Sequence, residues 1–133
     1  MTETQKEAVV KKVRSYENAA TIIWMVIGTL QVLAGLSGAF WLLVIGGFNL
    51  YGGYTYRERL PRITDRDSKL VKEYEDDLLN IIFIGAANLF LGGVIGVIAA
   101  VIDLVNRSYV IKNAEAFDNV AEEDNEGEDV EAN

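Results

Sequence analysis

Three polar side chains in or directly after apolar stretches have the best potential for chemistry: Gln31, Asn88 and Asp103. An amide surrounded by hydrocarbon needs a hydrogen-bond partner, and such bonds between helices are worth roughly 0.6 to 2 kcal/mol. A carboxylate at this depth costs roughly 2.5 to 3.5 kcal/mol and often marks a path for ions or protons. These residues therefore allow two interpretations, bonding between helices or the polar lining of a substrate path. For both amides we favour bonding between helices.

Asp103 has a further interpretation, because Arg107 follows it by four residues. A pair at this spacing shares one helix face, and near the membrane surface its long side chains reach water. We favour this ion pair over a proton path, because one acid without a neighbouring acid or histidine is a weak basis for a relay. Two further amides, Asn49 and Asn106, lie near the expected cytoplasmic ends of helices and are also assigned to bonding between helices.

The residue types that carry much of catalysis and metal binding are absent from the chain. It has no His and no Cys, which removes the commonest general base, the commonest transition-metal ligand, and all thiol chemistry. Asp65 and Asp67 begin like a calcium loop, but Leu70 stands where that loop requires glycine. We therefore predict a protein that is not an enzyme, holds no cofactor or metal, and binds no nucleic acid.

Two long apolar runs must position these polar residues. The runs, Ala19–Tyr54 and Leu78–Ile102, contain no Asp, Glu, Lys or Arg. Because a bilayer core about 30 Å thick needs roughly 20 apolar residues per helix, the sequence predicts an integral membrane protein. The first run would measure about 54 Å as one helix, too long for one span. It is expected to break at residues 35–38 (Gly-Leu-Ser-Gly) and form a hairpin.

An internal repeat guides the interpretation of the second run, which is short enough to be one tilted span. A shift of 57 positions aligns Val26–Asn49 with Phe83–Asn106, with six identities in 24 pairs. The same shift pairs the four amides named above. We therefore predict a second hairpin, about Leu78–Leu91 and Gly93–Ile111, and an all-α protein of four short transmembrane helices. A single span in the second run, giving three spans in all, is the alternative.

Small residues in the second run predict close helix packing. Gly92, Gly96 and Ala100 recur at every fourth position, which lets helix backbones approach closely. On one continuous helix they would form a dimerisation face. In a hairpin Gly92 lies in the turn, and Gly96 and Ala100 stay on a packing face. We expect a homo-oligomer.

The distribution of basic residues predicts the orientation. Four Lys or Arg precede the first run, six lie between the runs, two follow the second run, and neither expected hairpin turn contains any. The positive-inside rule then places both termini and the central segment in the cytoplasm, with the protein in the plasma membrane. Residues 114–133 hold nine acids and no Lys or Arg, which is typical of a disordered tail.

These patterns divide the chain into five segments. They are an amphipathic lead-in at the membrane surface (1–18), a first hairpin (19–56), a charged cytoplasmic segment with a helix capped by Thr64 and Asp67 (57–77), a second hairpin (78–112), and an acidic tail (113–133).

The sequence carries no motif for a particular activity. We expect a membrane-embedded interaction, accessory or membrane-organising component, with the lipid bilayer and further copies of the chain as partners. A cytoplasmic protein that contacts residues 57–77 or the acidic tail is a further expected partner. One alternative is a small oligomeric transporter or channel lined by Gln31, Asn88 and Asp103. The other is a holin-like or toxin-immunity membrane protein.

Overall fold

The computed structural model describes residues 1–91 and 94–118 as helices joined by short turns. The predicted all-α class is confirmed. By length and composition, α1 and α5 are able to cross a membrane, and α4 is a shorter apolar helix. The elements in chain order are α1 (Glu3–Leu36), α2 (Trp41–Thr64), α3 (Lys69–Asp76), α4 (Leu78–Leu91), α5 (Val94–Lys112) and the short 3₁₀ helix η1 (Ala114–Ala116).

The lead-in and the first apolar helix form one continuous helix, α1. Thr2 caps its start: the Thr2 hydroxyl accepts from the Gln5 backbone N–H, and the Gln5 side chain accepts from the Thr2 N–H. No Pro or Gly occurs between residues 3 and 27, so nothing in the sequence interrupts the helix at the expected boundary near residue 18. The lead-in therefore continues the axis of the apolar helix.

The first hairpin is closed by glycines, as its sequence predicts. α1 ends at Leu36, and Gly38 adopts φ +125°, a conformation that glycine tolerates and that turns the chain into α2. Farther from the turn, a Cβ on Gly28 would lie 2.8 Å from the carbonyl oxygen of Gly46. A Cβ on Gly46 would likewise lie 2.8 Å from the carbonyl oxygen of Gly28. The backbones of α1 and α2 are therefore in direct contact.

The expected cap at Thr64 and Asp67 is wrong. α2 runs beyond the apolar segment to Thr64, whose hydroxyl donates to the Leu60 carbonyl inside α2. Asp67 instead accepts from the Lys69 N–H at the start of α3. The reversal between the helices is set by Arg66, which adopts a left-handed conformation with φ 58°.

The second hairpin follows the predicted bounds closely. α4 covers Leu78–Leu91, and α5 begins at Val94 and ends at Lys112. The expected turn at Gly92 and Gly93 lies outside the described residues, and so does the proposed packing role of Gly92. Gly96 lies against α4, because a Cβ added there would be 2.5 Å from the Asn88 Cβ.

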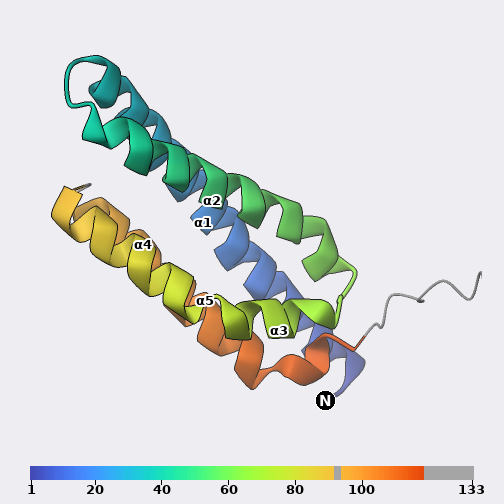
Figure 1. Cartoon of the computed structure of the whole chain (residues 1–133). Helices are drawn as coiled ribbons and strands as arrows, with labels where there is room; N and C mark the ends of the chain where they lie inside the picture. The colour runs from blue at the N-terminus through green and yellow to red at the C-terminus, as the bar shows by residue number, and fades with distance from the viewer. Residues whose placement is uncertain (92–93, 119–133) are drawn as a thin grey trace, which may run out of the picture.

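The two hairpins lie side by side and meet mainly through α1 and α5 (Figure 1). α2 packs along α1, α4 packs along α5, and α2 also contacts α4. An apolar cluster between the hairpins joins the two pairs; its buried members are Ala20, Trp24, Ile27, Ile81, Ala99 and Ala100.

A second apolar core lies at the end of the molecule where the chain begins (Figure 1). It joins the start of α1, the end of α2, α3, the end of α5 and η1, and its buried members are Val9, Val13, Ile63, Leu70, Tyr74, Val110, Ala116 and Phe117. Val9 and Val13, which belong to the lead-in expected at the membrane surface, are inside this core. The apolar face of the lead-in is covered by protein.

Candidate functional site

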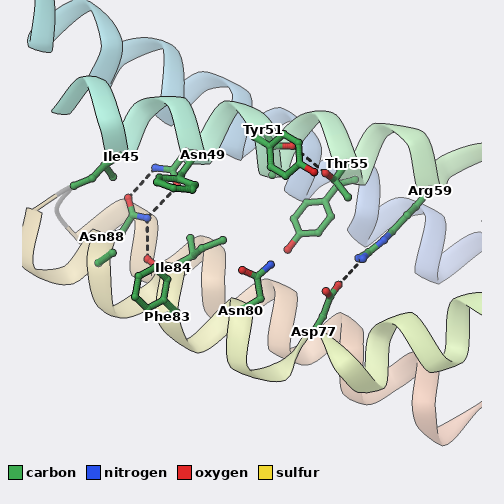
Figure 2. Close-up of a pocket in the computed structure, with 14 residues that line it drawn as sticks. Ile45, Asn49, Tyr51, Thr55, Arg59, Asp77, Asn80, Phe83, Ile84 and Asn88 are labelled. Atoms are coloured by element: carbon green, nitrogen blue, oxygen red, sulfur yellow. Dashed lines mark hydrogen bonds and ion pairs between the residues drawn. The ribbon is translucent and has the colours of Figure 1, made fainter. Parts of the chain in front are cut away.

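Three buried amides from three helices meet in the middle of the apolar segments. Asn49 Nδ2 on α2 donates to Gln31 Oε1 on α1 at 2.6 Å and to Asn88 Oδ1 on α4 at 3.0 Å. Asn88 Nδ2 donates back to Asn49 Oδ1 at 3.1 Å, and Gln31 Nε2 donates to Asn88 Oδ1 at 3.1 Å. The Asn49–Asn88 bonds are visible in Figure 2. This amide triad joins the two hairpins and leaves its members at most 6% exposed.

Asp103 is bonded to the other hairpin. Its Oδ2 accepts from Trp24 Nε1 on α1 at 2.7 Å and from the Tyr56 hydroxyl on α2 at 3.0 Å. Two neutral donors satisfy this oxygen, and the residue is 6% exposed. The geometry is that of a structural acceptor between helices.

The predicted pair of Asp103 with Arg107 is not formed. Arg107 Nη2 donates to the Glu75 backbone carbonyl at 2.9 Å, next to the start of α4. Asp103 faces the interior of the helix assembly, where Trp24 and Tyr56 supply donors, whereas Arg107 lies one turn farther on and reaches α3. The spacing of four residues is compatible with an ion pair, but Asp103 and Arg107 each bond to a different helix instead.

Glu17 is the centre of a buried polar cluster that the sequence pattern does not indicate. The Tyr74 hydroxyl donates to Glu17 Oε2 at 2.7 Å, and Asn106 Nδ2 donates to the same oxygen at 2.8 Å. Asn106 therefore bonds α5 to α1 and does not meet Asn49. Burial raises the pKa of Glu17 to about 7, opposed by the Tyr74 hydrogen bond and the positive charge of Arg59. Glu17 precedes the apolar segment that begins at Ala19, which made it resemble a solvated residue.

Arg59 lies next to this cluster and is paired with Asp77. Arg59 Nη2 donates to Asp77 Oδ2 at 2.5 Å, while Glu73 and Glu17 carboxylate oxygens lie 3.6 and 3.9 Å from other guanidinium nitrogens. Arg59 is 6% exposed, and its Nε and Nη1 have no hydrogen-bond partner. Its charge is balanced, but its donors are not all used.

A groove of about 340 Å³ lies between α2 and α4 and connects the amide triad with the Arg59–Asp77 pair (Figure 2). Its walls are mainly apolar and include Ile45, Phe48, Phe83, Ile84 and Ala87. Phe48 and Phe83 are 60% and 69% exposed, so the groove is open to the side. This groove is the candidate site.

Asn80 is a polar residue of the groove whose side chain has no hydrogen-bond partner. It lines the groove near Asp77, is exposed, and makes no hydrogen bond in the structure. Figure 2 shows its amide directed into the space between α2 and α4. An apolar groove with polar ends is suited to binding an elongated amphiphilic molecule. Among residues 1–91 and 94–118, no group of three or more acidic, His or Cys residues could hold a metal ion.

Searches against protein-family models, curated proteins and solved structures found no match to this chain. The class supported by its own geometry is an all-helical protein with two helices that are able to cross a membrane.

Proposed function

We propose that the chain is a multi-pass membrane protein in which α1, α2, α4 and α5 each cross the plasma membrane. The outward faces of all four helices support this arrangement, since they expose large apolar side chains such as Leu30, Phe48, Phe90 and Ile98. Water-soluble monomers rarely expose apolar patches beyond a few hundred Å². The distribution of basic residues supports an orientation with both termini and α3 in the cytoplasm.

Contacts between repeat-related residues support two tandem hairpins derived from one unit. Gln31 with Asn88, and Glu17 with Tyr74, are hydrogen-bonded pairs separated by 57 positions. Trp24 and Ile81 have the same separation and belong to one apolar cluster. Residues that meet their own counterparts are expected at a twofold pseudo-axis, which here would lie along the membrane normal.

The proposed role is that of a non-enzymatic interaction or accessory component, and the groove between α2 and α4 carries this proposal. Its volume of about 340 Å³ is within the range of ligand sites, and its apolar walls open toward the surrounding bilayer. In this arrangement the groove receives an apolar chain from the membrane. Homo-oligomerisation and a cytoplasmic protein partner remain part of the proposal.

The transporter or channel alternative has less support from the geometry. A solute path through the membrane would use mid-depth polar groups, but Gln31, Asn49 and Asn88 are buried and bond to one another. Asp103 is likewise occupied by Trp24 and Tyr56. No contact of the described residues favours the holin-like or toxin-immunity alternative.

Because the chain has no Cys, single-cysteine variants can test what fills the groove. We would attach a nitroxide label at Ala87→Cys in the groove, at Val44→Cys on an outward apolar face, and at Lys72→Cys on α3. In lipid vesicles, the label at position 87 should collide readily with oxygen and poorly with a water-soluble nickel chelate, as at position 44. The label at position 72 should collide readily with the nickel chelate and less readily with oxygen. Access of the chelate to position 87 equal to that at position 72 would overturn the proposal in favour of a water-filled path.

A further inference from the structure

We infer that the groove between α2 and α4 binds a phospholipid of the cytoplasmic leaflet whose head group carries a primary ammonium. One acyl chain lies along the apolar walls, and the ammonium lies at Asp77. This inference rests on the proposed function, because the four-span arrangement defines which end of the groove faces the cytoplasm.

The length of the groove matches one leaflet. Asn49 lies at the end of the groove near the membrane midplane, and Arg59 lies at its cytoplasmic end. Ten residues of α2 separate them, which is about 15 Å of helix. A bilayer core is about 30 Å thick, so a groove of this length reaches from the surface to the midplane. An acyl chain of the same leaflet has that extent, and the exposed Phe48 and Phe83 give it an apolar contact surface.

The charges at the cytoplasmic end of the groove favour a positively charged head group. Arg59 is surrounded by Asp77, Glu73 and Glu17, and the second cation nearby, Arg62, is itself bonded to Glu73 and to Asp67. Glu17, with a pKa of about 7, is only partly ionised near neutral pH. Asp77, Glu73 and Asp67 still outnumber Arg59 and Arg62. Sites for anionic lipids use clusters of Lys and Arg, which this end of the groove does not present. An ammonium would be attracted by the excess negative charge.

Asn80 provides for the phosphate next to the ammonium. It follows Asp77 by three residues, so the free amide and the carboxylate lie on the same side of the chain. The Asn80 amide lacks an acceptor, which a phosphate oxygen would supply. A carboxylate beside an amide donor thus matches an ammonium beside a phosphate.

A second copy of the chain fits the groove less well. The outward faces that it would insert are apolar, as at Leu30 and Phe90. Such a face would cover Asp77 and Asn80 without offering either a hydrogen-bond partner, and burying unpaired polar groups is costly. An amphiphile satisfies the polar end and the apolar walls together.

The test measures lipid binding to the purified full chain by native mass spectrometry. Three lipids with identical acyl chains would be titrated separately: phosphatidylethanolamine (ethanolamine lipid), phosphatidylcholine (choline lipid) and phosphatidylglycerol (glycerol lipid). The dissociation constant of ethanolamine lipid should be lower than that of glycerol lipid by a factor of roughly five or more, because the primary ammonium makes a charge-assisted hydrogen bond. Choline lipid, which has the charge but no N–H donor, should lie between them.

Variants locate the preference in the groove. Asp77→Asn should remove the advantage of ethanolamine lipid, whereas Glu75→Gln, at an exposed acid outside the groove lining, should retain it. If Asp77→Asn does not fold because Arg59 loses its partner, Asn80→Leu provides the test. Asn80 bonds to nothing, and its replacement should weaken ethanolamine-lipid binding severalfold while leaving the fold intact.

Equal binding of the three head groups, or tighter binding of glycerol lipid, would overturn the inference. A dimer that excludes lipid would also overturn it and favour a second copy as the occupant. These failures are distinct from failure of the proposed function. Equal binding together with a bilayer-like environment at position 87 would leave the lipid-filled groove standing, whereas an aqueous environment there would remove both.

Discussion

Gln31 on α1 and Asn88 on α4 share a hydrogen bond of 3.1 Å although 57 positions separate them. Asn49 completes the amide triad by bonding to both. The two hairpins are therefore joined, within their apolar segments, by three side chains that satisfy one another. In an apolar environment this contact fixes how the hairpins align, because any sliding would leave amides without partners.

Replacing Asn88 with Leu should destabilise the protein by about 1 to 3 kcal/mol, since it leaves buried groups of Gln31 and Asn49 short of partners. Unfolding in detergent micelles would measure the change. Thr29→Val is the control, because it removes an exposed hydrogen bond within α1 only. If Asn88→Leu lowers the free energy of unfolding no more than Thr29→Val does, a structural role for the triad is contradicted.

Gly46 and Gly47 form a matched pair for testing the contact between α1 and α2. A Cβ on Gly46 would lie 2.8 Å from the Gly28 carbonyl oxygen, whereas a Cβ on Gly47 would meet nothing within 4 Å. Gly46→Ala should therefore cost about 1 to 3 kcal/mol of overpacking. Gly47→Ala should be neutral or stabilising by up to about 1 kcal/mol, because Ala favours helix. The same unfolding measurement applies, and equal effects of the two substitutions would argue against direct backbone contact.

Much of the helix arrangement could be predicted from the sequence. The length of the first apolar run and the glycines at residues 35–38 fixed a hairpin, and the internal repeat located the ends of α4 and α5 within one or two residues. The repeat also paired Gln31 with Asn88. These features depend on chain length and on periodic composition, which are visible without knowledge of contacts.

The partners of the charged residues could not be predicted in the same way. Glu17 resembled a solvated residue of the lead-in, yet Tyr74 and Asn106 bury it. Asp103 and Arg107 have helical pairing distance, but each bonds to a different helix. Such choices depend on which helices are neighbours in space, and the sequence signal for Glu17 was only its separation of 57 positions from Tyr74.

Loss of Arg59 should be more damaging than loss of an exposed ion pair. Arg59→Met removes the charge that balances Asp77 and Glu17, and leaving a buried charge unpaired costs about 3 to 5 kcal/mol. Glu3→Gln, which breaks the exposed pair between Glu3 and Arg66, should leave the unfolding temperature nearly unchanged. If both variants unfold at the wild-type temperature, the Arg59 cluster does not contribute to stability.

Glu17 should make stability depend on pH. Its folded pKa of about 7 is above the ordinary value of 4.5, so the folded state holds the proton more tightly than the unfolded state. The resulting stabilisation is fully present below pH 4.5 and is lost as the pH rises through 7, with a slope of up to about 1.4 kcal/mol per pH unit. Unfolding measured at several pH values should show this slope in the wild type and a flatter curve in Glu17→Gln. Identical slopes for the two proteins would contradict the raised pKa.

Cysteine labelling in intact cells should distinguish four spans from three. With four spans, Ser37→Cys and Val94→Cys lie at the outer surface and should react with a membrane-impermeant maleimide. Lys72→Cys and Lys112→Cys should react only after the cells are permeabilised, because the positive-inside rule keeps both segments in the cytoplasm. All four positions are exposed, so the side of the membrane should control their reactivity. Labelling of Lys112→Cys in intact cells, with Val94→Cys unreactive, would establish a single span after α3.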